Sequence, residues 1–182
     1  MTNIIVVGGG AAGLLAGIAA TELGAQVMIL EKMRTPGRKM LITGKGRCNI
    51  TNNCEIAEII RNLPGNGRFL NSALHRFSND DMIYLLESHG LQTKVERGGR
   101  VFPVTDKAKD VVDTLLNIYR EKGGKLLVDQ TVSKILIEDG CVAGVVTNDG
   151  NKYTADAVII TTGGASYPGT GSDGNGFTLA KA

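Results

Sequence analysis

The alternation of apolar and polar stretches at the N-terminus predicts one strand-turn-helix-strand unit. Residues 4–7 form a continuous apolar run, which is typical of a parallel strand covered on both faces. A glycine cluster at 8–13 follows, and small and apolar residues from about 11 to 23 then predict a buried helix. A second apolar run at 27–30 completes a unit of about thirty residues, the size of a βαβ crossover.

The hydrophobic pattern changes in the middle of the chain. Residues 32–54 carry six basic residues and no acidic one, and they predict a long irregular segment, which in a compact domain is usually functional. Ser78 is a candidate N-cap with Asp81 three residues on. The pattern predicts helices near 55–63, 68–77, 80–88 and 107–121, and a short strand pair at 93–96 and 100–102.

The last third of the chain predicts a return to β structure. Short strand-like runs between 125 and 154, with an Asn148-Asp149-Gly150 hairpin signal, predict an antiparallel meander. The apolar run 157–161 predicts a final strand of the parallel sheet. We therefore expect an α/β fold of the Rossmann type, with a central parallel sheet, helices on both faces and an antiparallel β-meander.

The composition is that of an ordinary globular chain. Hydrophobic residues make up 42% and charged residues 21% of the 182 residues, and the net charge is +2, which argues against a mainly electrostatic nucleic-acid binder. No apolar run reaches the roughly 18 residues of a membrane span. The three cysteines form no CxxC pair, which favours a reducing, cytoplasmic setting, and no metal-ligand spacing is visible.

The glycine cluster satisfies the G-x-G-x-x-G pattern between a predicted strand and a predicted helix. In this context Gly8 permits a sharp turn, Gly10 lets a pyrophosphate approach the backbone, and Gly13 lets helix and strand pack closely. Ala11 and Ala12 open the helix, whose N-terminal N–H groups attract phosphate. The pattern therefore predicts a dinucleotide site.

Glu31 stands at the end of the second predicted strand, 18 residues past the last glycine of the cluster. A carboxylate at this place accepts hydrogen bonds from the ribose hydroxyls of an adenosine, and it repels a 2′-phosphate, which disfavours NADP at this site. The alternative is a solvated surface glutamate at a strand end.

The meander in place of a crossover helix resembles flavoproteins of the glutathione-reductase type. This resemblance implies FAD as the cofactor rather than NAD. It also implies that the backbone at Val132 contacts the adenine. The turn at Thr162, Gly163 and Gly164 corresponds to the strand-ending turn that closes over the cofactor.

The segment 36–52 narrows the resemblance to one family. It reads PGRKMLITGKGRCNITN, similar to the BaiN-like (YhiN-like) FAD flavoproteins, whose hallmark is GRK followed by S/T-G-x-G-R-C-N-x-T-N. The blocks 99–103 and 163–174 agree, while Thr43 and Lys45 replace the more frequent serine and glycine.

The family resemblance also supplies candidate cofactor residues in the basic segment. The cationic candidates for the FAD phosphates or the electron-rich edge of the flavin are Lys32, Arg38, Lys39 and Arg47. The candidates beside the flavin ring are Thr43, Gly44, Gly46, Cys48 and Asn49. A solvated basic loop is the alternative, and no catalytic residue is identified.

The resemblance implies an FAD-dependent oxidoreductase with NADH or NADPH as electron donor. The substrate stays open between a small molecule and an RNA uridine. A non-catalytic or RNA-directed dinucleotide-binding module that uses the basic segment is the alternative. Family members are about twice as long, so residues 1–182 are expected to be an N-terminal FAD-binding portion with little turnover by itself. Its substrate domain would follow 171–174, where Asp173 is a candidate N-cap of a final helix.

Overall fold

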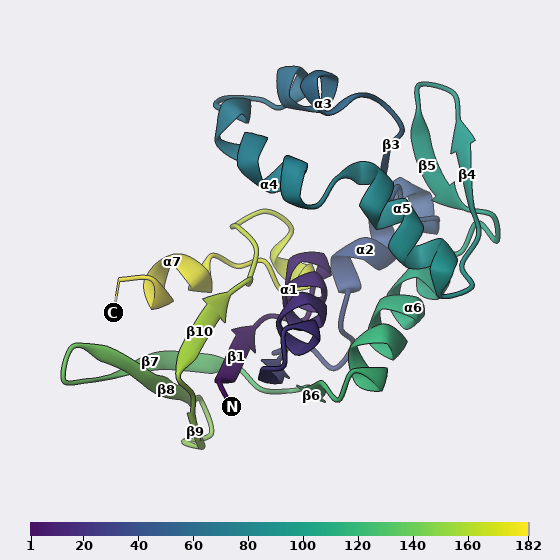
Figure 1. Cartoon of the computed structure of the whole chain (residues 1–182). Coiled ribbons are helices and arrows are strands. Elements are labelled where there is room, and N and C mark those ends of the chain that lie inside the picture. Colours follow the sequence, from purple (N-terminus) through teal and green to yellow (C-terminus); the bar gives the residue numbers. More distant parts are fainter. Residues whose placement is uncertain (182) are drawn as a thin grey trace. The chain divides into compact units, whose positions relative to one another are not determined.

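The computed structural model describes residues 1–181 and divides the chain into two compact units (Figure 1). The first, here called the Rossmann unit, comprises Met1–Met40 and Leu115–Ala182. The second, here called the inserted unit, comprises Leu41–Thr114. Residues 41–114 thus form a unit of their own between two stretches of the Rossmann unit.

A parallel sheet of four strands forms the centre of the Rossmann unit, in the order β10-β1-β2-β6. Val7 lies opposite both Leu30 and Ile160, so three of the strands end at the same edge of the sheet. The predicted parallel sheet is thereby confirmed. Its strands are β1 (Asn3–Val7), β2 (Gln26–Leu30), β6 (Lys125–Leu127) and β10 (Ala157–Ile160).

One face of the sheet is covered by α1 (Ala11–Glu22), and the second half of α6 (Ala108–Glu121) contacts the sheet through Tyr119. The Tyr119 ring of α6 lies against Gly17 of α1. Its hydroxyl lies 2.9 Å from the carbonyl oxygens of both Val27 and Lys125, to either of which it can donate its one hydrogen, and burial raises the pKa of Tyr119 to about 12. Tyr119 therefore ties α6 to β2 and β6.

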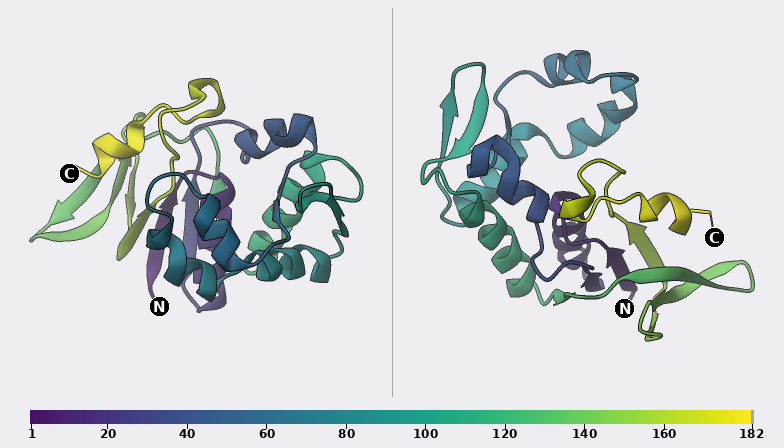
Figure 2. Two further views of the ribbon diagram at one scale, coloured as in Figure 1. Left: turned by 90° about the horizontal axis from the view of Figure 1, so that it is seen from above. Right: turned by 180° about the vertical axis from the view of Figure 1, so that it is seen from behind.

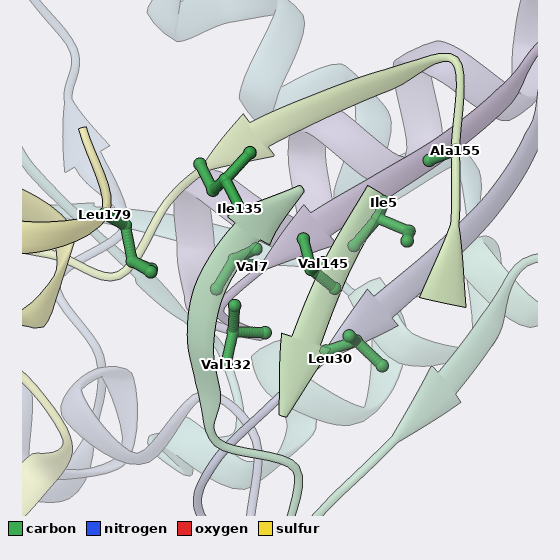
Figure 3. Close-up of a cluster of buried hydrophobic side chains, with 8 residues drawn as sticks. All are labelled: Ile5, Val7, Leu30, Val132, Ile135, Val145, Ala155 and Leu179. Carbon is green, nitrogen blue, oxygen red and sulfur yellow. The ribbon is translucent and has the colours of Figure 1, made fainter. Parts of the chain in front are cut away.

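The opposite face carries the meander and the short helix α7 (Asn175–Leu179), which lie together in the views of Figure 2. The meander has the order β7-β8-β9, with strands β7 (Val132–Glu138), β8 (Cys141–Thr147) and β9 (Lys152–Thr154). Helices thus contribute to both faces, as expected. Figure 3 shows the buried core between these layers, made of Ile5, Val7, Leu30, Val132, Ile135, Val145, Ala155 and Leu179.

The turn signals of the Rossmann unit are confirmed with one shift of position. The predicted hairpin between β8 and β9 is closed by the Gly150 N–H, which donates to the Thr147 carbonyl at 2.9 Å. The N-cap of α7 is Gly174, with a φ of 86°, and not Asp173. This left-handed conformation favours glycine. The side chain of Asp173 instead accepts a hydrogen bond from the Asn175 N–H at 3.2 Å.

The inserted unit combines short helices with a small antiparallel sheet in the order β3-β5-β4. Its Ser78–Asp81 capping box is formed in both directions, as predicted. The strands are β3 (Thr51–Asn52), β4 (Thr93–Glu96) and β5 (Arg100–Pro103). The helices are α3 (Ile56–Asn62), α4 (Asn71–Arg76) and α5 (Asn79–Ser88), and α2 (Arg38–Ile42) spans the boundary with the Rossmann unit.

Two secondary-structure predictions were inaccurate. The basic segment is not irregular throughout, because it contains α2, a 3-10 turn at Thr43–Gly46 and β3; Arg, Lys, Met and Leu in α2 are strong helix formers. The helix expected at 68–77 is divided into a 3-10 turn, Gly67–Leu70, and α4, and such turns are common at helix N-termini. Among the described residues, no helix is long and apolar enough to cross a membrane.

Candidate functional site

The glycine turn between β1 and α1 is packed at two positions and open at a third. Gly8 has a φ of 107°, and a Cβ atom there would lie 2.7 Å from the Thr161 carbonyl oxygen. A Cβ atom on Gly13 would overlap the carbonyl oxygen of Gly8. A Cβ atom on Gly10 would meet no atom within 4 Å. The packed glycines shape the turn, and Gly10 leaves room for a ligand against the backbone.

The N-terminus of α1 faces this room without a side-chain cap. Gly10 is the N-cap in extended conformation, with a φ of −82°, and it has no side chain that could cap the first N–H groups. The first turn holds no acidic residue, and Ala11 and Ala12 are exposed. Uncapped N–H groups and the partial positive charge of the helix end together favour an anion such as a pyrophosphate.

Glu31 lies at the carboxyl end of β2 with its side chain buried beside the glycine turn. Its exposed fraction is 8%, which rules out the alternative of a solvated surface glutamate. Oε2 accepts from the Gly9 N–H at 2.6 Å, and Oε1 accepts from the Met33 N–H at 2.7 Å. A carboxylate has about four lone-pair positions, so two backbone donors leave room for ribose hydroxyls.

The segment after β10 meets the same edge of the sheet. The Thr161 hydroxyl lies 3.0 Å from both the Val7 and the Gly8 carbonyl oxygens, to which it can donate. Thr162, Gly163 and Gly164 follow at once, and both glycines are exposed. The predicted cofactor turn therefore lies directly beside the glycine turn, where ligands bind in open parallel sheets.

Two of the predicted cofactor lysines are paired with the loop between β10 and α7, residues 161–174, here called the β10–α7 loop. Lys39 Nζ donates to the Ser166 carbonyl at 3.0 Å and to Ser172 Oγ at 2.7 Å. Lys32 Nζ lies 2.7 Å from Asp173 Oδ1, and this contact lowers the pKa of Asp173. Both ammonium groups thus hold the loop in place.

The other predicted contacts of the Rossmann unit differ in exposure. Arg38 is exposed at the start of α2. Val132 is buried, with an exposed fraction of 2%, and its side chain belongs to the core. Its carbonyl oxygen accepts from Asn175 Nδ2 at 3.0 Å, so this acceptor already has one partner within the protein.

The predicted flavin-side residues of the inserted unit form a loop with several left-handed positions. Gly44, Lys45, Gly46 and Cys48 have φ values of 55°, 59°, 84° and 62°. Two of these residues carry side chains, so the loop holds backbone strain that its surroundings must offset. Part of that support comes from the Cys48 N–H, which donates to the Thr43 carbonyl at 3.1 Å.

Cys48 is a neutral thiol rather than a reactive thiolate. Burial raises its pKa, and a hydrogen bond with the Thr43 side chain offsets part of that rise. Within residues 1–181 all cysteines are free, so Cys48 and Cys54 form no disulfide. No group of three or more His, Cys, Asp or Glu side chains in that part of the chain could hold a metal ion.

Arg47 is held by carboxylates of its own unit. Its Nη1 lies 2.8 Å from Glu96 and 3.3 Å from Asp106, and its guanidinium lies 4.0 Å from the centre of the Phe102 ring. The hydrogen bond from Arg47 lowers the pKa of Glu96, and that from Lys94 at 2.6 Å contributes most to lowering the pKa of Asp106. The guanidinium therefore already has anionic partners.

The sequence interpretation missed these partners. Ser172 and Asp173 in the Rossmann unit, and Glu96 and Asp106 in the inserted unit, were not expected to hold the basic segment. One signal was available, because the segment holds six basic residues and no acidic one, so any ion pair that it forms needs a carboxylate from outside the segment.

Residues 2–182 match the family described as HI0933-like protein Rossmann domain. The chain belongs to this family. It is the BaiN-like (YhiN-like) family of FAD-dependent proteins that the motif at 36–52 resembles, so the predicted family and its FAD cofactor are confirmed. The glycine turn, the uncapped helix end and the buried Glu31 fit the adenosine diphosphate part of that cofactor.

Curated relatives match along the whole chain. A 3-dehydro-bile acid delta(4,6)-reductase of Clostridium scindens is 35% identical over 100% of this chain and 44% of its own length. A ribosomal RNA dihydrouridine synthase of Escherichia coli is 34% identical over 98% of this chain and 44% of its own length. The chain thus spans less than half the length of these relatives.

Solved structures share the fold. The 3-ketosteroid-delta4-(5alpha)-dehydrogenase of Rhodococcus jostii superposes with a TM-score of 0.67 and 17% identity, over 91% of this chain and 46% of that protein. The Sdh1 protein of Mycobacterium smegmatis superposes with a TM-score of 0.64 and 21% identity, over 90% of this chain and 34% of that protein. At these identities the likeness establishes the fold.

Proposed function

We propose that this chain is the FAD-binding part of an oxidoreductase that takes electrons from NADH or NADPH. The observation that carries the proposal is the buried Glu31 carboxylate beside an uncapped helix N-terminus with an open Gly10. Gly10, Ala11 and Ala12 would hold the pyrophosphate, and Gly8 and Gly13 would shape the turn that binds it. Glu31 would accept hydrogen bonds from the ribose hydroxyls.

The remaining cofactor contacts are proposed from the family motif and from position. Thr162, Gly163 and Gly164 would line the cofactor beside the glycine turn, and the Val132 backbone would meet the adenine. Arg38 is exposed and free to approach a phosphate, whereas Lys32 and Lys39 would act mainly by fixing the β10–α7 loop. In the inserted unit the proposed flavin contacts are Thr43, Gly44, Gly46, Arg47, Cys48 and Asn49.

The bound flavin supplies the hydride and electron transfer, and the protein supplies binding, orientation and electrostatics. The contributions of this chain are the N–H groups of α1 for the phosphates and the carboxylate of Glu31 for the ribose. The buried thiol of Cys48 carries no charge at neutral pH, since its pKa is raised. We therefore assign Cys48 a packing role rather than a nucleophilic one.

Two substrate classes are candidates for the whole protein. One relative is named as a bile acid reductase and another as a ribosomal RNA dihydrouridine synthase, so a small molecule and an RNA uridine are both candidates. Because this chain spans 44% of those relatives, the proposal for the whole protein includes a substrate domain outside residues 1–182. The free cysteines suit the reducing cytoplasm in which we place it.

A non-catalytic or RNA-directed module built on the basic segment is a weaker candidate. That function needs cations available to phosphates in RNA. Three of the six basic residues of the segment, Lys32, Lys39 and Arg47, are instead paired with groups of the protein.

Two measurements on the full-length protein test the proposal. Chromatography of the cofactor released by denaturation should identify FAD, and FMN or NAD alone would contradict the cofactor assignment. Anaerobic titration with NADH and with NADPH should then bleach the flavin absorbance. A flavin that neither nucleotide reduces would contradict the proposed electron donor.

A further inference from the structure

Tyr167 holds an unusual position in the β10–α7 loop. Its φ and ψ are 57° and 62°, a left-handed conformation that is an outlier for a bulky side chain. Its side chain is nevertheless 70% exposed. The strained backbone therefore displays an aromatic ring instead of burying it.

The backbone on both sides of Tyr167 is fixed by hydrogen bonds. On one side, Lys39 Nζ donates to the Ser166 carbonyl at 3.0 Å. On the other side, the Tyr167 carbonyl accepts from the Thr170 N–H at 2.9 Å and from its hydroxyl at 2.8 Å. A 3-10 turn at Pro168–Thr170 follows directly. These hydrogen bonds hold the loop in shape through backbone atoms on both sides of Tyr167.

The loop lies at a defined place along the carboxyl edge of the sheet. The strand order is β10-β1-β2, with Glu31 after β2, the glycine turn after β1 and the β10–α7 loop after β10. The proposed ribose and pyrophosphate contacts therefore run from β2 to β1. A dinucleotide that continued in the same direction would reach the end of β10, where the loop displays Tyr167.

We propose that Tyr167 packs its ring against the isoalloxazine ring of FAD. The inference rests on the proposed function, because it takes the direction of the dinucleotide from the assigned ribose and pyrophosphate contacts. Aromatic rings stabilise each other by offset or edge-to-face packing. This contact would make Tyr167 a positioning residue for the flavin.

The test compares the affinities of FAD and ADP for four forms of the full-length protein: wild type, Tyr167→Leu, Tyr167→Phe and Tyr84→Leu. Tyr84 on α5 is a matched control, because its exposed fraction is 73%. Tyr167→Leu should weaken FAD by about tenfold and leave ADP unchanged, since ADP lacks the isoalloxazine. Tyr167→Phe should restore the FAD affinity, and Tyr84→Leu should alter neither ligand.

Flavin fluorescence gives a second readout that a merely structural role would not move. A tyrosine ring in contact with an excited flavin quenches its fluorescence by electron transfer, which phenylalanine cannot do. Both Tyr167 variants should therefore raise the fluorescence of bound FAD.

Three outcomes would overturn the inference. If Tyr167→Leu changed neither the affinity for FAD nor the fluorescence of the bound flavin, the ring contact would be contradicted. If Tyr167→Leu weakened ADP as much as FAD, the substitution would have disturbed the loop instead. Wild-type protein that binds neither FAD nor ADP would overturn the proposed function, and this inference with it.

Discussion

The glycine turn of the Rossmann unit and the basic segment after β2 were both predicted to contact the cofactor, yet their polar groups are arranged differently. In the turn, the N–H groups at the start of α1 have no side-chain cap, and Gly10 faces open space. In the basic segment, Lys32, Lys39 and Arg47 each have a partner within the protein. The backbone at the glycine turn is thus open to a ligand, while these three cations already form contacts within the fold.

The difference follows from the separation of the partners along the chain. Glycine spacing shapes the turn within six residues, and the neighbouring strand brings Glu31 to it. Lys39 binds groups 127 and 133 residues away, and Arg47 binds carboxylates 49 and 59 residues away. A motif can therefore specify the first site locally, whereas the pairing of a cation depends on the whole fold.

The largest effect is expected from a pair of glycine substitutions. Gly13→Ala should lower the free energy of unfolding by about 3 kcal/mol, because the added methyl group overlaps the Gly8 carbonyl oxygen. Gly10→Ala should leave stability nearly unchanged and weaken FAD, because its methyl group enters only the open space. Urea unfolding and FAD titration separate the two effects. Equal destabilisation by both substitutions would contradict the distinction between packed and open glycines.

The next largest effect is expected at Glu31. Glu31→Gln should weaken FAD by about 1.5–3 kcal/mol, the range for hydrogen bonds to a charged group. This corresponds to a loss of affinity on the order of 10- to 150-fold by calorimetric titration. The matched control is Glu138→Gln at the exposed end of β7, which should bind FAD like wild type. If folded Glu31→Gln bound FAD with an unchanged dissociation constant, Glu31 would not be the acceptor of the ribose hydroxyls.

A smaller effect is expected when Lys39 loses its charge. Lys39→Met removes the donors to Ser166 and Ser172 and should lower the free energy of unfolding by about 1–2 kcal/mol. Hydrogen exchange of the β10–α7 loop should become faster. Arg38→Met, one residue earlier and exposed, should change neither quantity. If both variants behave alike, Lys39 does not hold the loop.

Much of the fold could be predicted because its signals are local. The first βαβ unit, the Asn148-Asp149-Gly150 hairpin and the Ser78–Asp81 capping box each depend on residues within a short window. The return of β10 to the sheet was also predictable, because a continuous apolar run requires cover on both faces.

Other features depend on contacts that no short window contains. The left-handed Cys48 is one of them, because its conformation is unfavourable for any residue with a side chain. The separation of residues 41–114 as a unit is another, since it follows from where the chain packs rather than from a linker composition. In the candidate site, the glycine turn could be predicted from the sequence, but the partners of Lys32, Lys39 and Arg47 could not.

The smallest expected effect is on how stability depends on pH, which should differ between the two units. Arg47 and Lys94 hold the pKa values of Glu96 and Asp106 below their unfolded values of 4.5 and 3.8. This stabilisation is fully present above those values and is lost as the pH falls through the lower folded ones. Arg47→Met should therefore lose less stability than wild type when the pH falls below about 4.5.

The Rossmann unit should respond at the opposite end of the pH scale. Tyr119 has its pKa raised from 10.0 to about 12, so its contribution is present below pH 10 and is lost as the pH rises towards 12. Tyr119→Phe should remove this alkaline loss, and Arg47→Met should not. Urea midpoints followed by circular dichroism between about pH 3 and 11 would compare both variants with wild type. Arg47→Met should leave the loss of stability at high pH unchanged, and Tyr119→Phe should leave the loss at low pH unchanged. Either variant changing the other loss would show that the two units do not respond to pH independently.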